Sequence, residues 1–154
     1  MSKLIINSYQ EFESYLGQDL GVSEYLTISQ DQINTFADAT LDHQWIHTDP
    51  ERAAKESPFG GPIAHGYLTL SVAPHLWEQI AEIRNIKMMI NYGIEKFRFN
   101  QPVKVGDQVR LKAKMVDIAD LRGITKAQNT VDLEIKDQRK PAFTGILVFL
   151  YHFI

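Results

Sequence analysis

The fold is decided by Ile63-Ala-His-Gly-Tyr-Leu-Thr-Leu-Ser-Val-Ala-Pro-His-Leu-Trp-Glu-Gln-Ile80. This stretch follows the backbone-breaking run Pro58-Phe-Gly-Gly-Pro62, and its apolar residues would lie on nearly all sides of a helix. A helix that is apolar all round is typical of a buried element. The sequence therefore predicts one long, buried, central helix over residues 63–80.

Downstream of Arg84 the sequence predicts strands. Apolar and polar residues alternate in 109–115 and 131–135, and two further apolar runs span 88–99 and 143–153. The last run is almost continuously hydrophobic, as expected of a strand that is covered on both faces. Helices followed by antiparallel strands indicate an α+β fold in which a sheet wraps around the central helix.

Shorter elements are expected before the central helix. They are a helix over 8–16, a strand over 23–28, a helix that Ser29 caps and that ends near Thr40, and a helical turn over 50–55. Residues 41–50 have no sustained period and are expected to form a polar loop. Loops that rigid elements hold in place often carry the chemistry of a protein.

The composition is that of one compact domain. A chain of 154 residues with 44% hydrophobic residues can bury a sizeable core. Its 16 basic and 19 acidic residues are scattered, so neither nucleic acid nor a membrane surface is the expected partner. Cysteine is absent, which excludes disulfides, thiolate metal sites and cysteine nucleophiles. The first ten residues lack a signal-peptide core, so we expect a cytoplasmic protein.

Asp42 and His47 are the first candidates for chemistry. A carboxylate beside an imidazole raises the basicity of the ring, and the two groups can share the protons of one water molecule. A structural interpretation is also open at this point, in which Asp42 caps a turn and His47 is a surface or packing residue.

His65 and Gly66 stand at the start of the central helix and are the second candidates. A helix N-terminus offers unpaired backbone N–H groups and a partial positive charge. The Gly66 N–H could polarise a thioester carbonyl, because a glycine permits close approach. Alternatively, Gly66 serves close helix–sheet packing and His65 is a hydrogen-bonded core histidine.

A metal site is a weaker alternative. His43 and His47 are four residues apart, and Asp42 and Asp49 could add oxygen ligands. The segment lacks both a helical period and a His-Glu-x-x-His pattern, so no metal ion and no other cofactor is expected. A serine hydrolase is not expected either, because there is no Gly-x-Ser-x-Gly motif.

Three motifs stand in a fixed order along residues 20 to 150. They are Asp42-His-Gln-Trp-Ile-His47, Gly61-Pro-Ile-Ala-His-Gly-Tyr-Leu-Thr-Leu-Ser71, and Asn91-Tyr-Gly-x-x-Lys-Phe-Arg-Phe99 with Pro102-Val and Gly106-Asp107 after it. In this order they resemble the MaoC-like dehydratases, a family that includes (R)-specific enoyl-CoA hydratases and the nodulation protein N-like proteins.

The resemblance implies a hot-dog fold over residues 1–154, with a bent antiparallel sheet around the helix, and a homodimer in which two sheets join. It also implies a hydro-lyase that adds water to a trans-2-enoyl-CoA to give the (R)-3-hydroxyacyl-CoA. Asp42 and His47 would form the catalytic dyad, Gly66 would be the oxyanion donor, and Ser71 would support the site by hydrogen bonding.

The chain departs from the family pattern Gly-Asp-x-Asn-Pro-hydrophobic-His. Leu41, Gln44 and Trp45 replace the glycine, asparagine and proline. Gln44 keeps an amide that can hydrogen-bond in the site, whereas the bulk of Trp45 leaves the acyl-chain preference open. Ile63 and His65 are expected, with Trp45, to contact the substrate.

Lys96 and Arg98 are expected to meet the phosphates of coenzyme A, although they could equally be solvated strand charges. Two other functions remain open. A hot-dog domain can be an acyl-CoA thioesterase, which directs water at the carbonyl, or a non-catalytic module that binds acyl-CoA or acyl carrier protein. Fold alone does not decide between them.

Overall fold

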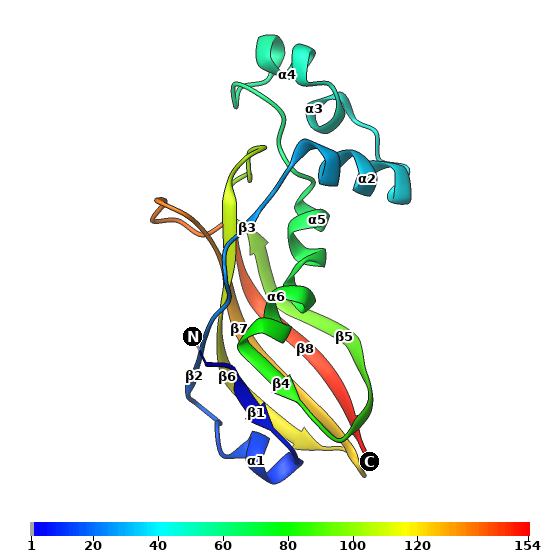
Figure 1. Ribbon diagram of the computed structural model, residues 1–154, viewed down its shortest axis with the longest axis vertical. Helices are drawn as coiled ribbons and strands as arrows, with labels where there is room; N and C mark the ends of the chain where they lie inside the picture. The colour runs from blue at the N-terminus through cyan, green and yellow to red at the C-terminus, as the bar shows by residue number, and fades with distance from the viewer. Residues whose placement is uncertain (1) are drawn as a thin grey trace.

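Six strands form one sheet whose pairings are all antiparallel, and two consecutive helices lie against it (Figure 1). The computed structural model describes residues 2–154. The strands are β2 (Asp19–Val22), β3 (Leu26–Thr27), β5 (Ile86–Phe99), β6 (Gln108–Asp120), β7 (Ile124–Ile135) and β8 (Phe143–Phe153). They are ordered β2-β6-β7-β8-β5, with β3 also paired to β6. The predicted α+β architecture is confirmed.

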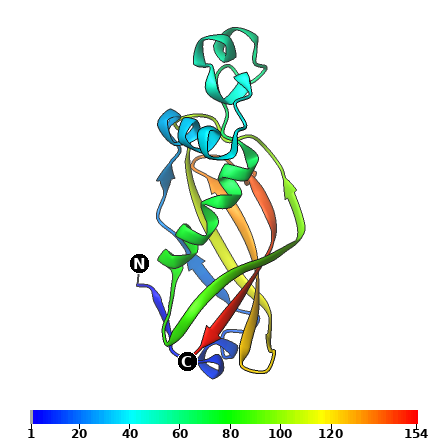
Figure 2. The same cartoon turned by 90° about the vertical axis from the view of Figure 1, so that its right-hand side faces the viewer.

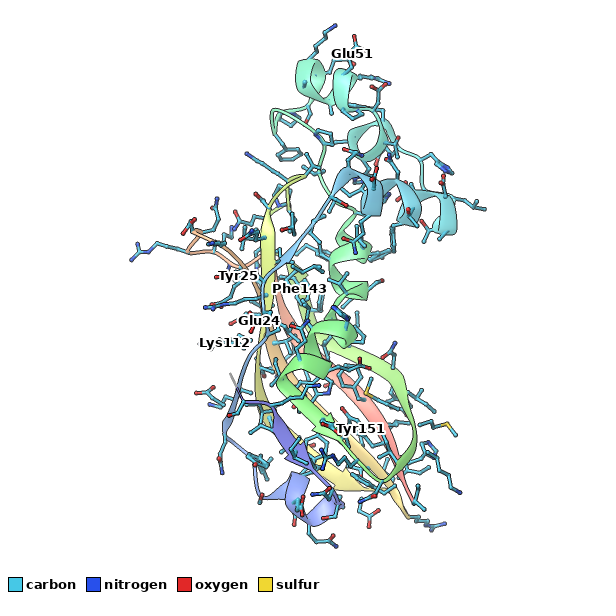
Figure 3. The ribbon with its side chains drawn as sticks, in the orientation of Figure 1. Glu24, Tyr25, Glu51, Lys112, Phe143 and Tyr151 are labelled. Atoms are coloured by element: carbon cyan, nitrogen blue, oxygen red, sulfur yellow. The ribbon has the colours of Figure 1, made fainter. Side chains whose placement is uncertain are left out.

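The sheet curves around the two helices, which cross its concave face (Figure 2). Along β7, side chains alternate between buried and half-buried at every position, so one face of the strand lies in the core. Phe143 and Tyr151 of β8 are fully buried in that core (Figure 3). The Tyr151 hydroxyl accepts a 2.8 Å hydrogen bond from the Trp77 indole, which joins sheet and helix in the interior.

The central helix differs from its prediction at its start and in its middle. It begins at Gly66 rather than Ile63, and it consists of α5 (Gly66–Ser71) and α6 (Ala73–Ile80). Pro74 has no N–H to donate to a carbonyl four residues earlier, and its ring crowds that turn, which accounts for the interruption. The expectation of burial on all sides was wrong, because Tyr67 is 71% exposed and His75 is also exposed.

The predicted cap at Ser29 is confirmed, whereas the helix expected over residues 8–16 is shorter than predicted. The helix α1 (Tyr9–Glu13) is present, and Ser29 accepts from the Gln32 N–H at 3.1 Å at the start of α2 (Gln30–Thr40). The Asp49 carboxylate caps α4 (Pro50–Glu56) in the same way, through the Arg52 N–H at 3.0 Å.

Three local features differ from the prediction. The expected loop over 41–50 contains one helical turn, α3 (Trp45–Thr48), and the strand expected over 23–28 is reduced to the two residues of β3. An additional parallel pair joins β1 (Leu4–Ile6) to β4 (Ala81–Ile83). Within residues 2–154, no helix is both long enough and apolar enough to cross a membrane.

Candidate active site

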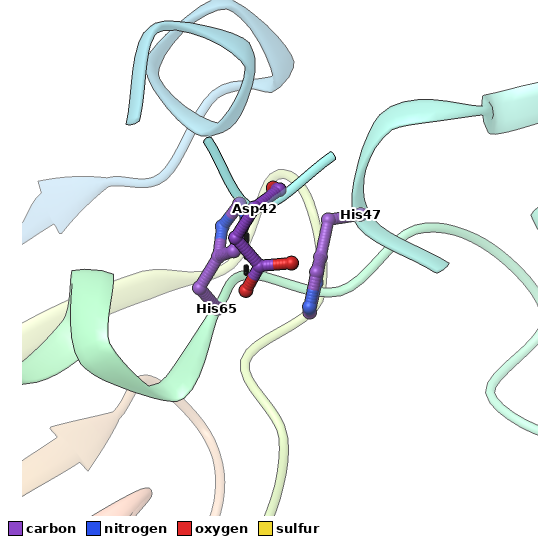
Figure 4. A group of neighbouring side chains, drawn as sticks. All are labelled: Asp42, His47 and His65. Carbon is purple, nitrogen blue, oxygen red and sulfur yellow. Dashed lines mark hydrogen bonds and ion pairs between the residues drawn. The ribbon is translucent and has the colours of Figure 1, made fainter. Parts of the chain in front are cut away.

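Three side chains converge where α2, α3 and the segment before α5 meet (Figure 4). Leu41 ends α2 with a left-handed φ of 65°, which turns the chain so that Asp42 follows it outside the helix. The Gln44 carbonyl accepts from the N–H of His47 at 3.0 Å and so closes the single turn of α3. This turn places the His47 side chain toward Asp42 and His65.

Asp42 and His47 are close enough to share a small molecule. One carboxylate oxygen of Asp42, one ring nitrogen of His47 and one of His65 all lie within 4.8 Å of one another. Two groups that bind the same water lie roughly 4.5 Å apart, because two hydrogen bonds of about 2.8 Å meet at a tetrahedral angle. The structure therefore brings the predicted acid/base pair together around a space of the right size.

Hydrogen bonding determines which nitrogen of His47 is available. Its Nδ1 lies 2.7 Å from the carbonyl oxygen of Ile63. A carbonyl only accepts, so Nδ1 carries the proton and Nε2 keeps its lone pair. Burial lowers the pKa of His47 below its ordinary value, although the bond to Ile63 and the charge of Asp42 act in the opposite direction. The lone pair of Nε2 is thus available to accept a proton.

This environment predicts how His47 titrates. Its pKa in the folded protein should lie below 6.5, so the ring stays neutral at neutral pH and gains its proton only in more acidic solution. The measurement is the pH dependence of the His47 ring resonances in an NMR titration, with a His47→Asn sample to assign them. A midpoint at or above 6.5 would contradict the assignment of burial as the dominant influence.

Gly66 and His47 face one cavity of about 410 Å³. The residues around it include His47, Ile63, Gly66, Thr69, Phe99 and Asn100. Gly66 is the first residue of α5, where helix geometry leaves the backbone N–H without an intrahelical acceptor. The ring of Phe99 covers Gly66 so closely that a methyl group added there would lie 3.0 Å from Cζ. A side chain at position 66 would therefore displace the Phe99 ring.

Phe99 and Thr69 are cavity residues that sequence reasoning did not select. Phe99 lies in the third motif, but its apolar character alone gives no sign that it covers Gly66. The buried Thr69 hydroxyl donates to the Gly66 carbonyl at 2.6 Å and so fixes the first turn of α5.

Ser71 lies apart from the dyad. Its hydroxyl donates to the Tyr67 carbonyl at 2.6 Å, and it lines a second cavity of about 370 Å³ between α5, β5 and β8. Gly66 and Ser71 are five residues apart, which at 3.6 residues per turn separates their directions by about 140°. The structure therefore does not bring Ser71 to the dyad.

Four of the remaining predicted contacts do not line the cavity of about 410 Å³: Gln44, Trp45, Lys96 and Arg98. Gln44 is exposed, and Trp45 is half-buried with the Arg52 guanidinium 4.3 Å from its ring centroid. Lys96 and Arg98 are exposed on β5, and neither takes part in an ion pair within residues 2–154. Ile63 lines the cavity and also orients His47, whereas His65 is buried behind the dyad.

Of the four residues of the metal alternative, Asp42 and His47 are brought together, whereas His43 and Asp49 are not. His43 pairs with Asp38 at 2.9 Å, and Asp49 caps α4. The cluster that forms instead contains His65, whose Nε2 lies 2.9 Å from the Asp42 carbonyl oxygen and donates to it. Within residues 2–154, the Asp42 carboxylate and Nε2 of His47 make no hydrogen bond, whereas Nε2 of His65 is engaged in the bond to the Asp42 carbonyl.

Comparison with known proteins identifies related chains. The family model described as a MaoC like domain matches residues 11–136. The 3-hydroxyacyl-thioester dehydratase Z of Mycobacterium tuberculosis is 44% identical over 94% of this chain and 95% of its own length. Nodulation protein N of Rhizobium leguminosarum bv. viciae is 43% identical, over 95% and 92%. The structure of the (R)-hydratase from A. caviae superposes with a TM-score of 0.69 and 26% identity, over 87% of this chain and 94% of that one.

Proposed function

Because this chain belongs to the MaoC-like dehydratase family, we propose that it is an (R)-specific enoyl-CoA hydratase, which interconverts trans-2-enoyl-CoA and (R)-3-hydroxyacyl-CoA. The supporting observation is that His47 and Gly66 face one cavity, with the Asp42 carboxylate within 4.8 Å of a His47 ring nitrogen. Fold and family are shared with a 3-hydroxyacyl-thioester dehydratase, and the A. caviae relative is an (R)-hydratase.

In the proposed reaction, Asp42 and His47 hold one water molecule. The Nε2 lone pair of His47 takes a proton from that water as its oxygen bonds to C3 of the enoyl group. The electrons of the C2–C3 double bond move toward the thioester carbonyl, and the dyad returns a proton to C2 on the same side. One water is consumed, and the enzyme regains its starting protonation.

Negative charge develops on the thioester oxygen during this step. The Gly66 N–H at the start of α5 would meet it, and such a donor contributes about 3–4 kcal/mol to transition-state stabilisation. The exposed Lys96 and Arg98 would lie outside the cavity with the coenzyme A phosphates, which are the anionic part of the substrate.

The purified protein should consume crotonyl-CoA and longer enoyl-CoAs, seen as loss of the absorbance of the conjugated thioester. Free thiol is measured in the same samples. Release of thiol without hydration would indicate an acyl-CoA thioesterase instead, and binding without either reaction would indicate a non-catalytic acyl-carrier module. Enoyl groups carried on acyl carrier protein are tested in parallel, to show whether the enzyme uses that carrier or coenzyme A.

We also propose a homodimer that joins two sheets at β5. This strand pairs with β8 along one edge, and no strand within residues 2–154 pairs with its other edge. Five large apolar side chains of β5 are at least 40% exposed: Met88, Ile90, Tyr92, Ile94 and Phe99. An unpaired strand edge with apolar side chains is a surface that a second copy can cover.

Lysines introduced on this edge of β5 are expected to separate the dimer into single chains. The double variant Ile90→Lys with Ile94→Lys should halve the mass measured by light scattering, because like charges would face each other across the interface. Val116→Lys is the matched control, since Val116 is 40% exposed on β6, away from this edge. A wild-type protein with the mass of one chain would contradict the proposed dimer, and so would a double variant of unchanged mass.

A further inference from the structure

We propose that His65 is a positioning residue, which holds the backbone of Asp42 and the ring of His47 in their reactive arrangement. This inference rests on the proposed function, because it assigns a role within the same site. The His65 side chain is 3% exposed and is not among the described residues that line the cavity. It can therefore act on the reaction through Asp42 and His47, without contact with the substrate.

The hydrogen bond from His65 fixes Asp42. His65 Nε2–H donates to the Asp42 carbonyl oxygen at 2.9 Å, and this is the one hydrogen bond of Asp42 found within residues 2–154. The chain leaves α2 at Leu41, so no helical bond restrains Asp42. The position of its carboxylate consequently depends on a residue 23 positions away.

The ring of His65 also supports His47. The two imidazoles stack with their centroids 3.9 Å apart and their planes 25° apart, and Phe36 contacts the same His65 ring from α2 at 5.0 Å. The Ile63 carbonyl, two residues before His65, orients the His47 ring through Nδ1. One short segment before α5 thus holds both members of the dyad.

A purely structural role does not account for a histidine here. Its Nδ1 is buried and has no hydrogen-bond partner within residues 2–154, which costs stability. A phenylalanine would fill the same space against Phe36 and His47 without that cost. What phenylalanine lacks is the N–H that reaches the Asp42 carbonyl, so this donor is the property that the position requires.

Two matched variants test the inference. His65→Gln places an amide N–H at about the reach of Nε2, whereas the side chain of His65→Asn is one methylene shorter, and both lack the ring. Backbone amide hydrogen exchange at His47, Thr48 and Asp49, whose hydrogen bonds close α3, should be about 10-fold faster in the asparagine variant than in the glutamine variant, since the lost bond to Asp42 frees the segment that leads into α3. This measurement needs no turnover.

The kinetic prediction separates positioning from substrate contact. His65→Asn should lower kcat about 10- to 100-fold with KM almost unchanged, because misplaced catalytic groups cost rate rather than affinity. His65→Gln should recover most of kcat. His65→Phe should keep or raise the melting temperature while losing kcat, since it removes the donor together with the unpaired nitrogen.

A double-mutant cycle completes the test. In an Asp42→Asn background, His65→Asn should cause a smaller further loss than in the wild-type background, because the part of the effect that acts through the Asp42 bond is already lost. Additive losses, a raised KM with unchanged kcat, or equal amide exchange in the glutamine and asparagine variants would each overturn the inference. If the wild-type protein hydrated no enoyl thioester, the proposed function would fail, whereas the exchange comparison would still decide the role of His65.

Discussion

Asp42→Asn and His47→Asn are each expected to lower kcat for enoyl-CoA hydration by about 10²- to 10⁴-fold, the usual contribution of a general acid or base. The asparagine at position 42 has the shape of aspartate but cannot exchange the proton. At position 47, an asparagine amide can still donate to the Ile63 carbonyl, so the variant removes the Nε2 base while keeping that bond.

His43→Asn is the matched control for these variants. His43 lies in the same loop, is exposed and pairs with Asp38 rather than with the dyad. The kcat of His43→Asn should stay within about two-fold of the wild-type value, as surface substitutions usually have small effects. The double variant of Asp42 and His47 should be little worse than either single variant, because residues that act as one unit are not additive. Single variants with undiminished hydration would disprove the assigned mechanism.

Gly66→Ala should lower kcat by about 10²-fold or more, which is the scale measured when one oxyanion donor is lost. The added methyl group would lie between 3.0 and 3.3 Å from three carbons of the Phe99 ring. Carbon atoms prefer separations of about 3.5–4.0 Å, so either the ring or the start of α5 must move. Phe99 is 45% exposed and can give way, but the ring and the methyl then occupy the space beside the Gly66 N–H.

Phe99→Leu provides the control and the rescue. Leucine lacks the ring carbon nearest Gly66, so the double variant Gly66→Ala with Phe99→Leu should regain part of the lost rate. Phe99→Leu alone should leave the Gly66 N–H accessible and keep most of the activity. Kinetics of the three variants, with melting temperatures to confirm folding, measure the effect. Full activity of Gly66→Ala would show that the thioester oxygen does not need to approach the Gly66 N–H closely.

Much of the fold was predictable because its elements carry local signals. Alternation identifies β6 and β7, the apolar run identifies β8, and a serine at the right place identifies the start of α2. The pairing of β1 with β4 was not predictable, because two strands of three residues join across more than 70 positions. Only tertiary packing makes such short segments into strands.

The sequence indicated that Asp42, His47 and Gly66 would lie near one another, but it did not select Phe99 or Thr69, and it placed Ser71 at the dyad, where it does not lie. The spacing of Asp42 and His47 does not reveal that α3 turns His47 inward, nor that Ile63 and His65 orient the two groups from a distant segment. Those bonds depend on how α2, α3 and α5 meet. The sequence likewise could not predict that apolar side chains of β5 are exposed in the single chain. An apolar strand pattern is the same whether the strand is covered by its own chain or by the proposed second copy.

The most direct test of the central claim is hydration of trans-crotonyl-CoA in D₂O, followed by NMR and chiral analysis of the product. We predict (R)-3-hydroxybutyryl-CoA with one deuterium at C2, added on the same side as the hydroxyl, because one dyad handles both protons of the water. Formation of the (S) product, addition to opposite sides, or release of free coenzyme A in place of hydration would contradict the account.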